Sequence, residues 1–407
     1  MISEGKRANR GRWLLWLSLA AALPATAGIF KKDPPPPPAA ATPVVKEAVE
    51  PEAPDAPPAP RAPPMFPDGV PVAVSELPAG LASLSAQGCN ACHYTQHDAW
   101  QGSAHRSAWI SPTFRHAAEA AGDAPVCVSC HLPLATQQQQ LVVEYTGGPL
   151  TTAKVKPNPS WDATLAQEGV TCAACHVRDG AVIGRRAAPG APHPVKVSDE
   201  LGTSAFCATC HQLTWPGADK PFYDTWGEWS ASAYAEAGVR CQDCHMPPES
   251  GRVTASRSLT HAGHGFDAAH GRGLSVLVRV APDAATRGEP MEATLLLQNT
   301  GAGHAIPTGS PFTRLRVEVA LLDAEGEALG EPFVHLIGRE VKPDPPYDTV
   351  SDTRLMPGDE LALPVTLDLP QKGDGGWGVL SVRLLRQGPG GPEDTPFYVQ
   401  KIPLMVY

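Results

Sequence analysis

All ten cysteines of this chain lie in five copies of the pattern Cys-x-x-Cys-His, and no other feature restricts the possible folds as strongly. The cysteines are Cys89, Cys92, Cys127, Cys130, Cys172, Cys175, Cys207, Cys210, Cys241 and Cys244. The histidines that end the five copies are His93, His131, His176, His211 and His245. Two thiols at this spacing reach the two vinyl groups of one haem, and the adjacent histidine falls under the iron. We therefore predict five covalently attached c-type haems with these histidines as proximal ligands.

Other uses of cysteine explain the pattern less well. Disulfides do not require a histidine after every second cysteine. Zinc sites pair Cys-x-x-Cys units, but a tetrahedral site has no need for five Cys-His neighbours in a row. A thioredoxin-like motif would occur once, beside a βαβ pattern.

The spacing of the motifs predicts how the haem region is built. All five lie within residues 70–273, so each haem has roughly 40 residues of chain, which is too few for an ordinary side-chain core. We expect the porphyrins to form the core and to approach one another closely. A chain of closely packed haems conducts electrons.

Nine further histidines could supply the distal ligands, and bis-histidine iron suits electron transfer because it has no vacant position. We predict that the distal ligands are His105, His193, His264, His270 and His304. His304 lies in a glycine-rich segment and could serve its own chain or a neighbouring one. At least two of the cluster His261, His264 and His270 should be ligands, whereas His97, His116 and His335 are not expected to be ligands.

The beginning of the chain has the pattern of an export signal. Basic residues precede an apolar run from Trp13 to Leu23, which is followed by Ala25-Thr26-Ala27. We predict a signal peptide over 1–27, with an uncleaved anchor as the alternative, and a Pro/Ala-rich disordered tether over 28–69. The mature protein is then periplasmic or at the cell surface, without a stable membrane span.

The sequence after Gly273 changes to strand-like alternation. Apolar and polar residues alternate over 275–280, 293–298, 315–319, 361–369, 379–385 and 397–406, with turn signals between them. Residues 274–407 therefore predict an all-β sandwich. It follows a haem domain, residues 70–273, that is mostly irregular or α-helical, with helical stretches expected at 98–108, 112–121, 161–168 and 225–237.

The net charge of −10 gives no reason to expect nucleic acid as a partner. We expect redox protein partners and, as an open alternative, self-association.

Several segments over residues 86–270 resemble the multihaem cytochromes related to the tetrahaem carrier of hydroxylamine oxidation. They are Trp100-x-x-Ser103-x-His105 after the first motif, Phe114 before the second, Gly169-Val170-Thr171 before the third, Trp229-x-x-Ser232 before the fifth, and His264-x-Phe266. Gly303-His304-x-x-Pro307-Thr308-Gly309 is similar to the β domain of many such cytochromes. The resemblance implies electron transfer, stacked haem pairs and a distal role for His105. A fifth motif departs from the four-haem pattern, so the ligand pairing cannot be transferred whole.

Three functional hypotheses remain open at this point. The first is an electron carrier in extracytoplasmic respiration, with bis-histidine haems and no substrate chemistry of its own. The second is a subunit of an extracellular cytochrome filament, some relatives with a β domain being known to polymerise. The third is a haem oxidoreductase with one open-site haem.

Overall fold

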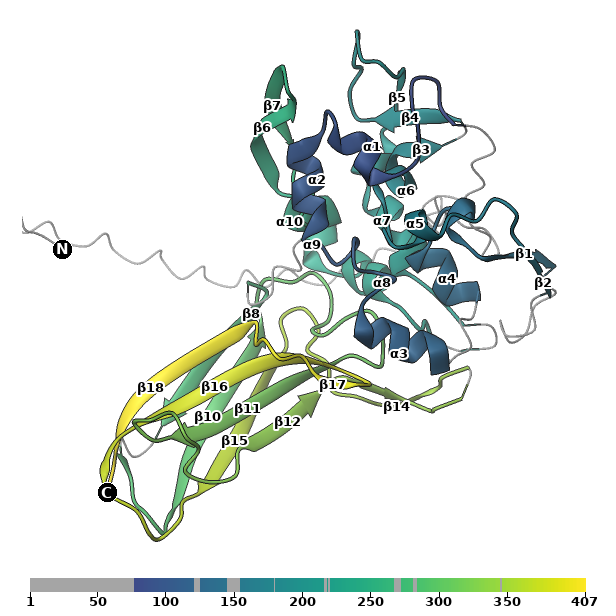
Figure 1. Cartoon of the computed structure of the whole chain (residues 1–407). Helices are drawn as coiled ribbons and strands as arrows, with labels where there is room; N and C mark the ends of the chain where they lie inside the picture. Colours follow the sequence, from purple (N-terminus) through teal and green to yellow (C-terminus); the bar gives the residue numbers. More distant parts are fainter. Residues whose placement is uncertain are drawn as a thin grey trace, which may run out of the picture. The chain divides into compact units, whose positions relative to one another are not determined.

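The structure, a computed structural model, describes residues 77–120, 125–144, 154–178, 180–215, 218, 220–266, 272–280, 284–344 and 346–407. The predicted export signal, the predicted tether and the predicted ligand His270 lie outside the described residues. Contacts between residues divide the chain into two units, Met1–Pro57 and Pro58–Tyr407. The second unit holds short helices toward one end and long strands toward the other (Figure 1). The predicted boundary at Gly273 stays a prediction.

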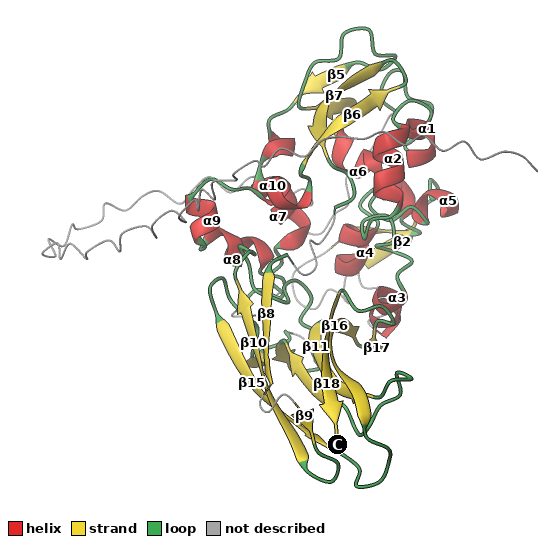
Figure 2. Cartoon of the chain, turned by 90° about the vertical axis from the view of Figure 1, so that its left-hand side faces the viewer, coloured by secondary structure: helices red, strands yellow, loops and turns green. Residues whose placement is uncertain are grey.

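The cysteine-rich region, residues 77–266, is built from short helices and small hairpins (Figure 2). Its helices are α1 (Ala86–Asn90), α2 (Tyr94–Gln101), α3 (Pro112–Ala120), α4 (Pro125–His131), α5 (Ala163–Ala166), α6 (Cys172–His176), α7 (Ser204–His211), α8 (Thr225–Ser230), α9 (Ala233–Glu236) and α10 (Cys241–His245). Two 3-10 turns are η2 (Ala135–Gln137) and η4 (Glu200–Gly202). The strands are β1 (Gln140–Glu144), β2 (Lys154–Pro157), β3 (Val177–Arg178), β4 (Ala181–Gly184), β5 (Val195–Val197), β6 (Pro248–Thr254) and β7 (Arg257–Ala262).

The β region, residues 274–407, contains two sheets. One has the order β15-β10-β8 and the other the order β12-β11-β16-β18-β9, with the short β17 paired to β16 and a separate hairpin β13-β14. The strands are β8 (Leu274–Val280), β9 (Ala284–Ala285), β10 (Pro290–Asn299), β11 (Arg314–Leu322), β12 (Phe333–Ile337), β13 (Arg339–Val341), β14 (Thr349–Asp352), β15 (Glu360–Asp368), β16 (Gly376–Gly388), β17 (Gly391–Pro392) and β18 (Tyr398–Val406). All pairings are antiparallel except that of β18 with β9.

One apolar core lies between these two sheets. Leu295 and Leu297 of β10 and Val365 of β15 are buried in the same cluster as Val317 of β11 and Leu384 of β16. Burial alternates along β10 and β11, because successive side chains of a strand point to opposite faces. The predicted strands are thereby confirmed as strands, and the two facing sheets fit the predicted sandwich.

The predicted helices are shorter in the structure. α2 ends at Gln101, so the helix expected to reach residue 108 was wrong beyond that point. The Ser103 hydroxyl accepts a hydrogen bond from the amide of Arg106, a local turn that competes with helix. The stretch 225–237 is split into α8 and α9, and the Ser232 hydroxyl donates to the Trp229 carbonyl at the break, at 2.7 Å. The expected helix over 161–168 is reduced to α5.

The two regions share a cluster of aromatic side chains. Trp215 and Phe222 of the cysteine-rich region are buried against Phe312 and Tyr347 of the β region. Arg339 of β13 donates hydrogen bonds to two carbonyls of the cysteine-rich region, those of Pro221 at 2.8 Å and Phe222 at 3.3 Å. The β region is therefore packed directly on the segment between the fourth and fifth motifs.

Candidate haem-binding sites

Four of the five motifs end on the last residue of a short helix, whereas the first begins in α1 and ends at His93, the N-cap of α2. We number the sites in chain order: site 1 (Cys89–His93), site 2 (Cys127–His131), site 3 (Cys172–His176), site 4 (Cys207–His211) and site 5 (Cys241–His245). Residues three apart lie on the same face of a helical turn, so the two thiols of each motif point the same way. None of the ten cysteines forms a disulfide. Each site thus presents two thiols and one imidazole together.

Four motif histidines face a second histidine from a distant part of the chain. The ring centres are 6.2 Å apart for His93 and His193, 6.3 Å for His211 and His105, 6.2 Å for His176 and His264, and 6.2 Å for His245 and His304. Two metal–nitrogen bonds of about 2.0–2.1 Å, plus the distance from each nitrogen to its ring centre, add up to roughly 6 Å. The separation is what one metal ion held between two imidazoles requires.

Hydrogen bonds fix which ring nitrogen is free in several of these histidines. Nδ1 of His93 donates to the Val253 carbonyl at 2.7 Å, and Nδ1 of His176 donates to the Ile183 carbonyl at 3.0 Å. The distal His264 and His304 donate in the same way, to the carbonyls of Ala262 at 2.8 Å and Ala305 at 3.0 Å. A carbonyl can only accept, so Nδ1 carries the proton and Nε2 keeps its lone pair.

Burial keeps the rings neutral. It lowers the pKa of His105 and of His264 to about 4, and neighbouring histidines add to the effect. The pKa values of His176, His211 and His304 are also lowered, chiefly by burial. A histidine binds a metal through its neutral form, so these groups are ready ligands at neutral pH.

The residues present fit a c-type haem at these sites. Nδ1 of His193 is fully buried and has no hydrogen-bond partner in the described part of the chain. A buried polar atom normally has a partner, so an unpartnered ring nitrogen here fits a histidine that contacts a group which is not part of the chain. The paired rings, the two thiols beside each motif histidine and the neutral imidazoles agree with that fit. Within the described ranges, no three His, Cys, Asp or Glu side chains converge to hold a metal ion by themselves.

A chain of contacts places His105 opposite His211. The indole nitrogen of the buried Trp100 donates to the Val170 carbonyl at 2.9 Å, and the Val170 amide donates to the His105 carbonyl at 2.9 Å. Gly169 adopts a positive φ of 61°, and a Cβ there would lie 2.7 Å from the His105 carbonyl oxygen. A glycine is therefore required where the chain before site 3 passes His105. Phe266 packs edge-on against the His105 ring, with centres 4.4 Å apart.

Site 2 differs from the other four. The ring of Phe114 stacks on the ring of His131 with centres 3.6 Å apart, and Nδ1 of His131 donates to the Ala108 carbonyl at 2.6 Å. Among the described residues no second histidine ring faces His131. Burial lowers the pKa of His131 to about 4. The predicted ligand His270 is not among the described residues.

The remaining histidines lie away from the motif histidines. His261 contacts Gln96, with Nε2 at 3.2 Å from the Gln96 amide nitrogen. The expectation of at least two ligands in the cluster of three stays a prediction, because His270 lies outside the described residues. His97 is buried against Trp100. His116 is exposed, and His335 stacks beside Phe333 in β12.

Thiols of different motifs approach one another. A hydrogen bond between Cys89 and Cys172 lowers the pKa of Cys89 and raises that of Cys172. Cys130 and Cys210 make the same kind of contact, and so do Cys207 and Cys241. The hydrogen bond from Cys207 lowers the pKa of Cys241 to about 6. The attachment edges of sites 1 and 3, of sites 2 and 4, and of sites 4 and 5 are therefore neighbours.

Comparison with known proteins gives two matches of note. Residues 88–177, which hold the first three motifs, match the family described as cytochrome c554 and c-prime. The chain is also similar to a penta-heme cytochrome c552 from Thermochromatium tepidum, with a TM-score of 0.52 over 80% of this chain and 100% of that chain. These findings support a multihaem c-type cytochrome. They also support covalently bound haem c and haem-based electron transfer.

The other comparisons add little. Its identity to the Thermochromatium tepidum protein is 18%, so that likeness is one of fold. The CARDB domain of a Pyrococcus furiosus protein covers 33% of this chain with 14% identity and a TM-score of 0.20, too low to carry an argument. No curated protein matches the sequence. No helix in the described part of the chain is long and apolar enough to cross a membrane.

Sequence reasoning missed two features of the candidate sites. The stacking of Phe114 on His131 had a signal, since Phe114 belongs to the resembling segments, but its contact was not foreseen. The buried carboxylate of Glu228, which hydrogen-bonds the segment that carries His304, had no motif to reveal it.

Proposed function

We propose that this protein is an extracytoplasmic electron-transfer cytochrome with five covalently attached haems. The observation that carries the proposal is the set of four histidine pairs with ring centres 6.2–6.3 Å apart, each containing one motif histidine. Bound haem would supply an iron that exchanges single electrons. The protein's part is to hold each site by two thioethers and two imidazoles, which leaves those four irons without a vacant position.

The contacts between thiols support an order of sites. Cys89 reaches Cys172, Cys207 reaches Cys241, and Cys175 acts electrostatically on both Cys207 and Cys210. We infer a main row of sites 1, 3, 4 and 5. Site 2 joins this row beside site 4, because Cys130 reaches Cys210. A continuous row with entrances at both ends suits a carrier that receives electrons from one redox protein and delivers them to another.

Site 2 favours a second candidate function, a haem oxidoreductase with one open position. The described residues place Phe114, and no second imidazole, beside His131. Two half-buried phenols, Tyr223 and Tyr347, lie in the same side-chain cluster as Cys127 of site 2, and burial raises the pKa values of both. Such an open site would accept a small anion or gas molecule.

Haem counting by mass and electron paramagnetic resonance of the oxidised protein test the proposal. We expect five haems, with sites 1, 3, 4 and 5 low-spin. His270→Ala decides the state of site 2: a new high-spin signal would make His270 its ligand and favour the pure carrier. A high-spin signal already present in the unchanged protein would favour the oxidoreductase. Fewer than five haems, or more than one high-spin haem in the unchanged protein, would contradict the proposed carrier.

A further inference from the structure

Glu228 is a buried carboxylate at the boundary between the cysteine-rich region and the β region. It lies on α8, and its side chain is only 2% exposed. A buried charge is costly unless it is paired and hydrogen-bonded. The partners of Glu228 come from the β region, so the free energy of its burial is tied to the contact between the two regions.

The partners of Glu228 belong to two β-region segments. Oε2 accepts hydrogen bonds from the Ala305 amide at 3.1 Å and from the Thr308 hydroxyl at 2.6 Å. Oε1 accepts from the guanidinium of Arg354, which is itself paired with Asp352 at 2.8 Å. Because the single proton of Thr308 goes to the carboxylate, the Thr225 hydroxyl, 2.9 Å away, must donate to Thr308. α8 therefore holds the segment that begins with His304.

The same segment is held on its other side by the β region itself. Asn299 donates through its amide nitrogen to the carbonyls of His304 at 2.9 Å and Leu355 at 3.0 Å. Gly303 passes so close to α8 and α9 that an added Cβ would lie 3.1 Å from Trp229 and 3.2 Å from Tyr234. His304 thus lies at a point where the β-region loop is pressed against the cysteine-rich region.

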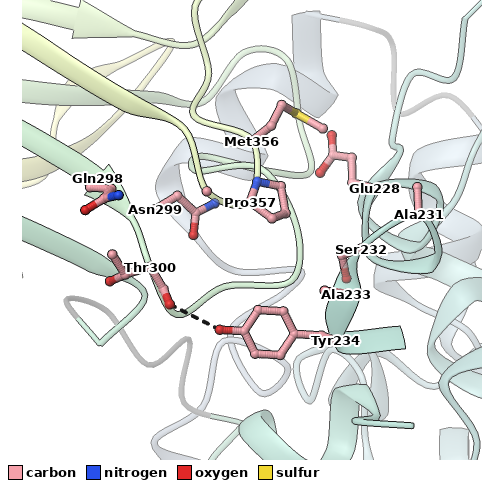
Figure 3. Close-up of a pocket in the computed structure, with 11 residues that line it drawn as sticks. Glu228, Ala231, Ser232, Ala233, Tyr234, Gln298, Asn299, Thr300, Met356 and Pro357 are labelled. Atoms are coloured by element: carbon pink, nitrogen blue, oxygen red, sulfur yellow. Dashed lines mark hydrogen bonds between the residues drawn. The ribbon is translucent and has the colours of Figure 1, made fainter. Parts of the chain in front are cut away.

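A cavity lies next to this contact. The cavity has a volume of about 570 Å³ and is lined from α8–α9 by residues including Glu228 and Tyr234, and from the β region by residues including Thr300 and Met356 (Figure 3). Across it the Tyr234 hydroxyl donates to the Thr300 carbonyl at 3.2 Å. Side chains do not fill this space, so on the cavity side the hydrogen bonds of Glu228 and Tyr234 are the contacts between α8–α9 and the loop that carries His304.

We propose that Glu228 is a positioning residue that keeps His304 of the β region opposite His245, so that ligation of site 5 depends on the docking of the two regions. The inference rests on the proposed function, which makes His304 the distal ligand of site 5. Loss of the carboxylate removes the acceptor of Ala305 and Thr308 and leaves the guanidinium of Arg354, whose side chain is 10% exposed, with Asp352 alone. The loop would then move away and leave His245 as the only protein ligand of its site.

The test compares carbon monoxide binding to the reduced, haem-loaded full-length protein and its variants, because only an iron with an open position binds this gas. Glu228→Ala should bind one more equivalent per chain than the unchanged protein, as His304→Ala should. Added imidazole should abolish that extra binding in both variants. Glu228→Gln keeps an oxygen acceptor at the same place and should gain less than Glu228→Ala.

Glu318→Ala is the matched control. Glu318 of β11 pairs with Arg316 at 3.1 Å and Arg383 at 2.9 Å, and its side chain is 17% exposed, so the variant also removes a paired carboxylate from the boundary of the same sandwich core. It should gain no carbon monoxide binding. An equal gain in this control, or no gain in folded Glu228→Ala, would overturn the positioning role.

Two further measurements keep the outcomes distinct. If His304→Ala gains no binding, the proposed ligation of site 5 fails and the positioning role falls with it. If His304→Ala gains one equivalent and Glu228→Ala does not, only the role of Glu228 fails.

Should Glu228→Ala not fold, Thr308→Val removes one donor of the network. It should raise hydrogen exchange at the Ala305 amide and give a fractional gain, and unchanged values in both measurements would refute the inference.

Discussion

The rings of His105 and His211 face each other with their centres 6.3 Å apart, although one follows the first motif and the other ends the fourth. His105 is carried by turns after α2, and His211 is the last residue of α7. The same relationship recurs at sites 1, 3 and 5, where a segment far along the chain places a second histidine opposite the motif histidine. The paired histidines bring distant segments together in the cysteine-rich region, where the clusters of buried apolar side chains are small.

His105→Ala should open site 4 without removing its haem. The thioether bonds are made by Cys207 and Cys210, so the mass should still show five haems, while one additional high-spin signal should appear in electron paramagnetic resonance. His116→Ala is the control, because His116 is exposed and faces no motif histidine. Retention of the full low-spin signal in His105→Ala would mean that another residue ligates site 4.

Gly169→Ala should disturb the same site from a distance. Gly169 has a positive φ, and its new Cβ would collide with the His105 carbonyl oxygen at 2.7 Å. We expect a loss of stability of about 1–3 kcal/mol and a partial high-spin signal. Gly180→Ala separates the two causes, since Gly180 has a φ of 70° but no atom within 4 Å of the added Cβ. Equal spectra for the two variants would show that backbone strain alone, and not the approach to His105, explains the effect.

Features of the fold that depend on residues close together in the sequence could be predicted from the sequence. β10 and β11 follow from alternation that a buried sheet face imposes, whereas the short helices that carry the motifs, such as α6 and α10, were not among the predicted helices. The candidate ligands His105, His193, His264 and His304 could be named because each is a rare residue in a suggestive setting. Their partners could not be named, since the pairing of His105 with His211 depends on contacts such as that of Trp100 with the Val170 carbonyl.

Other features had no local signal at all. Glu228 occupies an ordinary position on α8, and only the folded chain brings Ala305 and Arg354 to it. The split between α8 and α9 reflects one hydroxyl of Ser232 that bonds back to the chain, which a count of helix-forming residues does not detect.

The buried histidines predict that the protein loses stability in mild acid. Burial lowers the pKa values of His105, His131 and His264 from 6.5 to about 4, so in this range the unfolded chain binds protons that the folded chain does not. Stability is therefore complete above about pH 6.5 and falls as the pH drops toward 4, with a slope of up to about 1.4 kcal/mol per pH unit for each group. Ligation to iron would act in the same direction. Urea unfolding midpoints measured from about pH 7.5 to about pH 5 check this, and a constant midpoint would contradict it.

The position of His304 predicts that one chain is enough to complete site 5. His304 faces His245 of its own chain with ring centres 6.2 Å apart and planes inclined by 16°. A filament in which His304 ligates iron in the next protomer would instead leave site 5 open in the monomer and close it on assembly. We therefore expect the spectrum of the oxidised protein to be independent of dilution, and the monomer isolated by size exclusion to show site 5 low-spin. His304→Ala should open this site at every concentration without changing the oligomeric state. A monomer with an additional high-spin haem that disappears as polymers form would show that His304 acts between chains, because dilution alters only contacts between separate molecules.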